Sequence, residues 1–225
     1  MKALDLFCGA GGASKGIAQA GFDVVGVDHV HHTRYPFEFI QADALTFSVV
    51  GFDFVWASPP CQGYTTMRHA PGAVGAPLLI NAVRRKLQRT GVPYCIENVE
   101  EAAWTMRKPV TLCGSMFDLG SQGCRLQRHR LFECSFPLAQ PECSHDSRPV
   151  IGVYGGHARR RAASVGGRGT RDVWFGGHKT AASEAMGIYW MTLGELSEAI
   201  PPVYAKFVGD AVCAHIKGVN RISMA

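Results

Sequence analysis

The sequence predicts an α/β fold, in which a doubly wound and mostly parallel sheet carries a small basic lobe inserted toward the C-terminal end of the chain. Two observations lead to this fold class. Short apolar runs alternate with helical stretches over residues 2–96, which is the pattern of strand–helix–strand units. Glycine and polar residues follow directly after these runs, where parallel sheets bind ligands. A chain of 225 residues is also long enough to bury the core of one main domain.

The apolar runs in the first half of the chain are four to six residues long. Runs of this length are typical of buried strands and too short for most helices. Gly21 follows the first helical stretch and ends it, because glycine readily leaves the helical conformation. The predicted elements are a strand at residues 2–7, a helix at 13–20, strands at 24–27, 37–40 and 52–57, a helix at 77–89 and a strand at 92–96.

The regular pattern stops after residue 136 and returns near the C-terminus. Thr192 and Glu195 have the spacing of a capping box, which predicts the start of a helix. Val208 and Val212 lie on one face of a further helix. We therefore expect a main domain at residues 1–136, a small lobe at 137–180, and C-terminal helices at 181–225 that pack back on the main domain.

The net charge of +5 is concentrated in one part of the chain. Residues 147–180 contain seven arginine and lysine residues and a single acid, while the rest is close to neutral. Such an asymmetry points to a polyanionic partner such as nucleic acid. A solvated loop would give the same composition.

The eight cysteines form no CxxC pair and no disulfide framework, which favours a reducing, intracellular compartment. The sequence has no apolar run long enough for a membrane span. Cys134, Cys143 and His145 are candidate metal ligands, but their spacing is loose and a fourth ligand is not evident. We therefore predict no metal site.

A glycine-rich loop follows the first predicted strand. Glycines between a strand and a helix let a ligand approach the backbone and the helix N-terminus. Asp28, at the end of the second strand, could accept hydrogen bonds from a ribose, and Asp43 could accept one from an adenine amine. Either carboxylate alone fits a loop cap equally well. Together with the glycines they predict a site for a nucleoside cofactor.

Cys61 lies just beyond the apolar run 52–57, directly after a rigid diproline. A thiolate is a strong nucleophile when its surroundings activate it. Gln62 begins a polar stretch that continues with glycine and proline to about residue 77. This composition predicts that residues 64–77 form a lid beside the nucleophile. The alternative is a buried structural cysteine.

Glu97 follows the apolar strand 92–96, where burial can raise a carboxyl pKa and make the group a proton donor. Asn98 would hold it in place. Arg128 and Arg130 share one face of an extended segment, from which they could orient the substrate or Glu97. A turn cap and a surface strand would give the same two patterns.

These segments, in this order, resemble the DNA cytosine-5 methyltransferase family, whose fold is the sheet of the S-adenosylmethionine-dependent methyltransferases. Asp210 stands where the family usually has asparagine, and the variable lobe is short, which leaves room for relaxed specificity or a partner that supplies recognition. The matching segments are residues 5–12 (cofactor), Asp28 (ribose), Asp43 (adenine amine), 59–62 (nucleophile), 97–99 (protonation of cytosine N3), 127–130 (the paired arginines) and 207–212 (the final motif).

The resemblance implies methyl transfer from S-adenosylmethionine to C5 of a cytosine flipped out of double-stranded DNA. RNA cytosine, a free nucleotide, or a catalytically inactive protein of the same fold that binds nucleic acid remain alternatives. A nicotinamide-dependent oxidoreductase is disfavoured because the chain lacks GxGxxG spacing. The implied residues are Cys61, Glu97, Arg128 and Arg130 for catalysis; Asp5, Phe7, Gly9, Gly11, Gly12, Asp28, His29, Asp43, Ala44, Pro59, Asp210 and Ala211 for the cofactor; and Gln62, Asn98, Arg159, Arg160, Arg161, Arg168 and Arg171 for substrate.

Overall fold

The computed structural model describes residues 1–65, 74–154 and 172–223, with side chains up to Gly218. Much of the predicted lid at 64–77 lies outside these residues. So do the lobe arginines that we expect to contact substrate, namely Arg159, Arg160, Arg161, Arg168 and Arg171.

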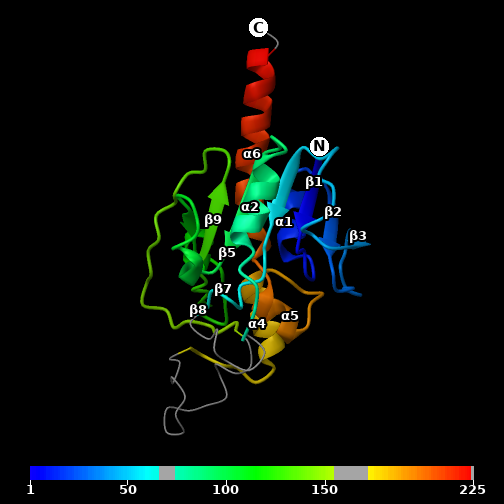
Figure 1. The fold of residues 1–225 in the computed structure, drawn as a ribbon. Helices are drawn as coiled ribbons and strands as arrows, with labels where there is room; N and C mark the ends of the chain where they lie inside the picture. The colour runs from blue at the N-terminus through cyan, green and yellow to red at the C-terminus, as the bar shows by residue number, and fades with distance from the viewer. Residues whose placement is uncertain (66–73, 155–171, 224–225) are drawn as a thin grey trace.

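A seven-stranded sheet forms the centre of the molecule, in the order β3-β2-β1-β4-β5-β9-β6 (Figure 1). The first five strands in this order are parallel, whereas β9 is antiparallel to both of its neighbours. The predicted α/β fold class is therefore confirmed. The strands are β1 (Lys2–Leu6), β2 (Asp23–Asp28), β3 (Glu38–Gln41), β4 (Phe54–Ala57), β5 (Tyr94–Asn98), β6 (Val110–Leu112) and β9 (Arg130–Cys134).

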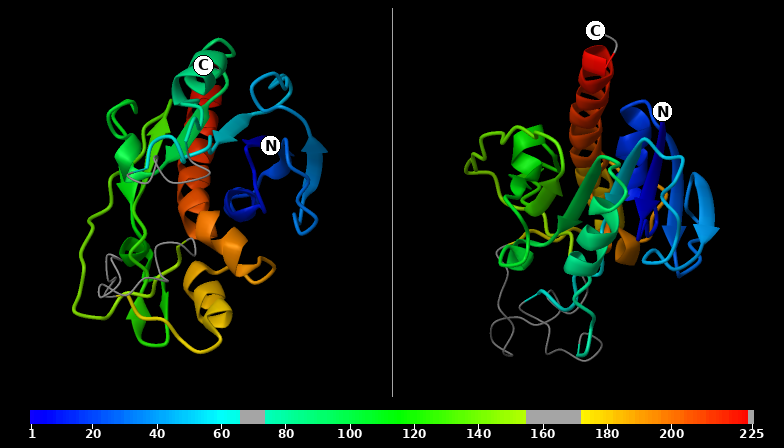
Figure 2. Two further views of the ribbon diagram at one scale, coloured as in Figure 1. Left: turned by 60° about the horizontal axis from the view of Figure 1, so that its bottom comes forward. Right: turned by 45° about the horizontal axis from the view of Figure 1, so that its top comes forward.

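Helices cover both faces of the sheet (Figure 2). The α1 helix (Gly12–Gln19) and the α6 helix (Pro202–Ser223) lie on one face, and the α2 helix (Ile80–Gln88) lies on the other. In β4, Phe54 and Trp56 pack in the core under α1 and α6, while Val55 packs in the core under α2. Burial on both faces explains why the strands are continuous apolar runs.

The C-terminal helix α6 packs closely against α1, the first helix of the chain. Gly16 makes this approach possible, because a Cβ atom there would lie 1.9 Å from the carbonyl oxygen of Pro202. None of the described helices has the length and apolar character that a membrane span requires.

A second, smaller core lies beyond the carboxyl ends of the parallel strands (Figure 1). Leu126, Ile151, Met186 and Leu196 are among its buried residues. The predicted boundary at residue 180 falls inside one of its helices, so residues 181–196 pack with the lobe. Its elements are β7 (Gly120–Ser121), β8 (Cys124–Arg125), α4 (His178–Met186) and α5 (Leu193–Glu198); two short 3-10 helices, η1 (Glu100–Ala102) and η2 (Gly114–Phe117), flank β6.

The β5 strand continues past its predicted end. Glu97 pairs with Phe132 and Asn98 pairs with Leu131 of β9. Both polar residues are therefore inside the sheet and buried, rather than in the loop that their polarity suggests.

Candidate active site

A cleft of about 500 Å³ opens at the edge where the parallel strands end. Phe7 follows β1 and Asp28 ends β2, while Cys61 comes from the turn after β4. Glu97 lies near the end of β5, and Arg130 begins β9, which reaches the same edge because it runs in the opposite direction. The cleft therefore joins the predicted nucleophile and proton donor to the predicted cofactor loop. Its lining includes the predicted residues Asp5, Phe7, Gly9, Gly12, Asp28, His29, Pro59, Cys61, Gln62, Glu97, Asn98 and Arg130.

The glycine loop forms one wall of the cleft. Gly9 has a φ of +50° and donates its amide to Oδ2 of Asp28 at 3.1 Å. Asp28 Oδ1 accepts the amide of Val30 at 3.0 Å and lies 3.1 Å from Nδ1 of the largely exposed His29. The loop also abuts the opposite wall closely, because a Cβ on Gly12 would lie 2.5 Å from the carbonyl oxygen of Ile200.

Asp5 is a fully buried carboxyl group beneath this loop. Its Oδ2 accepts a hydrogen bond from Ser14, whose hydroxyl also lies 2.7 Å from the hydroxyl of Tyr35. The other oxygen, Oδ1, has no partner in the described structure. Burial raises the pKa of Asp5 to about 7. A buried acceptor without a partner on the lining of a cleft is suited to a hydrogen-bond donor on a ligand.

The turn that carries Cys61 is fixed to β5. Asn98 Nδ2 donates to the carbonyl oxygen of Pro59 at 2.8 Å, and its Oδ1 accepts the amide of Val99 at 3.0 Å. The side chain of Asn98 thus holds the turn that carries Cys61. Its position next to Glu97 in the sequence suggests instead that it holds Glu97. On the other side of the turn, Tyr64 donates its amide to the Cys61 carbonyl oxygen at 2.9 Å.

Glu97 faces Arg130, with 3.5 Å between Oε1 and Nε. Burial raises the pKa of Glu97, although the charge of Arg130 and a hydrogen bond from Ser58 oppose the rise. Burial and the negative charge of Glu97 raise the pKa of the Cys61 thiol, and Arg130 again opposes the rise. The charge of one guanidinium therefore limits the rise in pKa at both Glu97 and Cys61.

Arg128 does not share the environment of Arg130. Its guanidinium is buried and donates to the carbonyl oxygens of Val153 at 2.7 Å, Ser197 at 2.8 Å and Ala199 at 2.8 Å. Arg128 therefore ties the lobe to the cleft wall, and its side chain is not part of the described cleft lining. That wall, residues 197–200, is a part of the site that the motifs did not indicate; the capping box at Thr192 predicts the preceding helix but not its contacts.

Five predicted cofactor residues are absent from the described lining of the cleft: Gly11, Asp43, Ala44, Asp210 and Ala211. Asp43 is exposed and caps a turn, where its Oδ1 accepts the amide of Leu45 at 2.9 Å. Asp210 forms an ion pair of 2.7 Å with Lys206 on α6. Because α6 already begins at Pro202, its final motif lies inside the helix and away from the cleft.

The fold is similar to that of three solved methyltransferase structures. A proposed DNA modification methyltransferase encoded within an E. coli prophage aligns with a TM-score of 0.59 at 14% identity, over 95% of this chain and 99% of that one. S. pombe Dnmt2 methyltransferase aligns with a TM-score of 0.53 at 13% identity, over 98% of this chain and 99% of that one. The methyltransferase EhMeth of Entamoeba histolytica has a TM-score of 0.53 at 10% identity, over 96% and 98% of the two chains.

The sequence itself is similar to a stretch of one further methyltransferase. It is 35% identical over 81 residues to the type II methyltransferase M.XorII of Xanthomonas oryzae pv. oryzae, and this stretch covers 28% of the present chain and 19% of M.XorII. No protein-family model matches the chain. The resemblance indicated by the motifs is confirmed by these similarities, and at the identities of the solved structures it is the fold that is shared.

Proposed function

We propose that this chain is a DNA cytosine-5 methyltransferase that uses S-adenosylmethionine. The observation that carries the proposal is the convergence of Cys61, Glu97 and Arg130 with the glycine loop on one cleft. A nucleophile, a proton donor and a cation beside a nucleoside-type pocket are the groups that this reaction needs. The names of the similar proteins, which include a DNA modification methyltransferase and a type II methyltransferase, support the same reaction class.

The residues present fit the cofactor. A cleft of about 500 Å³ is of the size that holds small ligands and cofactors. Asp28 would accept from the ribose hydroxyls, and the unpartnered oxygen of Asp5 would accept from a donor on the amino-acid end. When bound, S-adenosylmethionine supplies the electrophilic methyl group.

Cys61 and Glu97 would activate the cytosine ring together. The Cys61 thiolate adds to C6, and Glu97 gives its proton to N3, so that the electron pair of the C5–C6 double bond becomes available at C5. C5 then accepts the methyl group. A water molecule removes the remaining C5 proton, and the electron pair of that C–H bond restores the C5–C6 double bond as Cys61 leaves as thiolate; N3 returns its proton to Glu97.

The substrate base must leave its stack to reach Cys61, because the ring faces are covered in a duplex. We propose that Gln62 and Asn98 lie near the flipped base, and that the lobe arginines bind phosphates. Such contacts make the affinity strongly dependent on salt. We assign Arg128 to positioning, since its guanidinium already binds three backbone carbonyl groups.

The experiment is incubation with labelled S-adenosylmethionine and DNA, RNA or dCMP, followed by nucleoside mass spectrometry. We expect 5-methylcytosine in DNA, and none with Cys61→Ser. Cys213→Ser, which alters a buried thiol on α6 outside the cleft lining, should retain activity. Product in RNA or dCMP but never in DNA would overturn the proposed substrate. Full activity in Cys61→Ser would overturn the covalent mechanism.

A further inference from the structure

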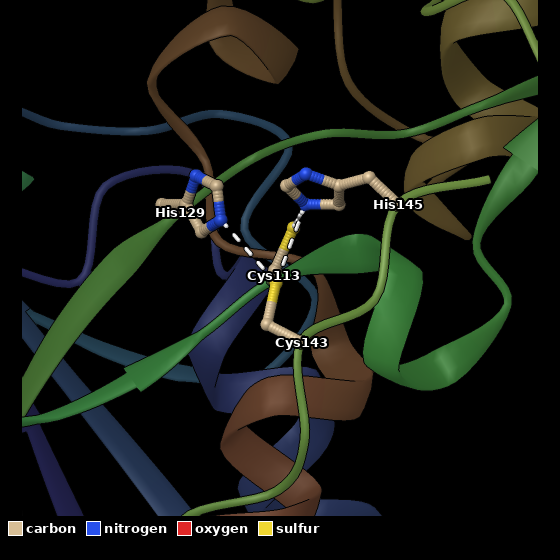
Figure 3. A group of neighbouring side chains, drawn as sticks. All are labelled: Cys113, His129, Cys143 and His145. Carbon is tan, nitrogen blue, oxygen red and sulfur yellow. Dashed lines mark hydrogen bonds between the residues drawn. The ribbon is translucent and has the colours of Figure 1, made fainter. Parts of the chain in front are cut away.

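Four side chains that the sequence pattern does not group together form a compact cluster outside the cleft (Figure 3). Cys113 follows β6, His129 directly precedes β9, and Cys143 and His145 lie on the irregular segment that leads from β9 to the lobe. Their four candidate ligand atoms all lie within 4.8 Å of one another. Both imidazole rings point a nitrogen toward the two sulfur atoms.

The distances within the cluster match those between the ligand atoms of a tetrahedral zinc ion. Zinc bonds of about 2.3 Å to sulfur and about 2.0 Å to nitrogen place these atoms about 3.5 Å apart at the tetrahedral angle. The Sγ of Cys113 lies 3.5 Å from Nε2 of His145. The Sγ of Cys143 lies 3.5 Å from Nε2 of His129 and 3.3 Å from Nε2 of His145. The three sulfur–nitrogen pairs therefore have the spacing of ligands around one ion.

His129 also has the outer contact that metal-bound histidines usually make. While its Nε2 faces the cluster, its Nδ1 lies 3.5 Å from Oε2 of Glu100 in η1. A carboxylate on the second nitrogen fixes the ring orientation and increases the basicity of the ligating nitrogen. The Glu100–His129 pair thus provides an observation independent of the cluster itself.

We propose that Cys113, His129, Cys143 and His145 bind a zinc ion in a structural site. Two thiolates and two imidazoles are a ligand set that favours zinc. All four positions of a tetrahedron are then filled by protein, which leaves no open position for catalysis and makes the site a crosslink. Cys134, which the sequence suggested as a candidate ligand, is not one of the four clustered residues. This proposal replaces the sequence-based prediction that the chain has no metal site.

The crosslink would hold a segment that has no regular secondary structure of its own. Residues 135–149 contain no helix or strand, and several of their side chains are exposed. Gln140 provides one attachment, since its side chain exchanges hydrogen bonds of 2.9 Å with the backbone of Thr111. A zinc ion at Cys143 and His145 would provide a second. It would also fix His129, the residue directly before Arg130, and so help to place the guanidinium opposite Glu97.

The metal is tested on the full-length chain, purified without chelator, incubated with zinc chloride and desalted. Mass spectrometric metal analysis should find one zinc per chain. X-ray absorption of this unaltered protein should show two sulfur neighbours at about 2.3 Å and two nitrogen neighbours at about 2.0 Å. This measurement needs no variant, so it decides the question even where a substitution prevents folding. A chain that retains no zinc, or zinc with only nitrogen and oxygen neighbours, overturns the proposal.

Variants then assign the ligands. Cys143→Ser and His145→Ala should each lower the zinc content of the desalted protein, and the matched control Cys134→Ser should retain one equivalent. Chelator should lower the Tm of the unaltered chain and of Cys134→Ser, and should change the Tm of the ligand variants little. Equal zinc loss in Cys134→Ser, or a Cys113–Cys143 disulfide found by peptide mass spectrometry in place of the metal, would overturn the assignment.

Discussion

Asn98 donates a hydrogen bond of 2.8 Å from Nδ2 to the carbonyl oxygen of Pro59. It thereby connects the strand that carries Glu97 to the turn that carries Cys61. The bond is buried. If the Asn98 side chain were removed, the carbonyl oxygen of Pro59 would be left without a hydrogen-bond partner and without water to replace it. The relative position of the two reactive side chains thus depends on a residue that need not touch the reacting atoms.

Asn98→Ala should therefore reduce the rate of methylation more than it reduces the affinity for the cofactor. We expect a loss of about 1–3 kcal/mol in folding free energy, typical of an unsatisfied buried group, and a larger relative loss of kcat than of cofactor affinity. Single-turnover kinetics and cofactor titration on the same preparation measure both. Gln140→Ala removes a comparable amide-to-carbonyl bond on the surface and should leave kcat unchanged. An unaltered kcat in Asn98→Ala would show that the turn is held by other contacts.

Arg130→Met should shift the pH–rate profile to higher pH. The charge of Arg130 lowers the pKa of both Glu97 and Cys61, so its removal raises both. The proposed mechanism needs ionised Cys61, which sets the rising limb of the profile, and protonated Glu97, which sets the falling limb. Both midpoints therefore move to higher pH. Arg85→Met removes the same charge from an exposed position of α2 and should leave the midpoints in place. A profile that keeps its midpoints, or shifts to lower pH, would contradict the assigned roles.

Asp5 should make the cofactor-free protein less stable as the pH rises. Its pKa is about 7 in the folded chain against an ordinary value of 3.8, so the folded state binds the additional proton between these values. This contribution is fully present below about pH 4 and is lost as the pH rises to about 7, on the order of 4 kcal/mol in total. Urea unfolding at several pH values measures it.

Asp5→Asn should flatten this part of the pH dependence, because the amide does not titrate in this range. Asp53→Asn provides the control. Asp53 is exposed and accepts the amide of Lys2 where β1 begins, at the end of the sheet opposite the cleft. The same slope in unaltered chain and Asp5→Asn would assign the pH dependence to other groups.

The buried ion pair between Arg84 of α2 and Glu133 of β9 should be essential for folding stability. Glu133 accepts two hydrogen bonds from Arg84, of 2.5 and 2.6 Å, and a third from the amide of Arg107 at 2.7 Å. Arg84→Met would leave a buried carboxylate without its cation, which costs about 3–5 kcal/mol. The adjacent, exposed Arg85→Met should cost little. Chemical denaturation compares the two, and similar losses would show that the pair is not the source.

The double variant Arg84→Met/Glu133→Leu shows whether the loss in Arg84→Met comes from the buried carboxylate that is left without its cation. If the single loss comes from the unpaired charge, removing the carboxylate as well should recover part of the stability. A double variant that is no more stable than Arg84→Met alone would contradict this explanation.

The strands were predictable because β1, β2, β4 and β5 are buried on both faces, which leaves a continuous apolar signal. The end of β5 was not predictable, since Glu97 and Asn98 are polar residues inside the sheet and only their pairing with β9 reveals this. The sequence indicated that Asn98 belongs to the site, but it did not indicate the contact with the carbonyl oxygen of Pro59, because the two residues are far apart along the chain.

Within the candidate site, the predicted residues that directly follow or end the parallel strands line one cleft, because parallel strands end together. Asp43 and Asp210 are absent from the described lining, since Asp43 caps its own turn and Asp210 pairs with Lys206 on α6. The metal cluster left a weaker signal. Only Cys143 and His145 are close in sequence, and Cys113 and His129 reach them through the fold.

The reversed direction of β9 has a consequence for how such a chain can diversify. Because β9 runs against its neighbours, it starts at the cleft and ends at the far edge, and α6 starts again beside Gly16 of α1. The described residues between these two anchors, 135–154 and 172–201, form an excursion that leaves this frame and rejoins it. Cys61 and Glu97 belong to the frame, so a change in the excursion outside the cleft-wall residues 197–200 leaves the strands that position them in place.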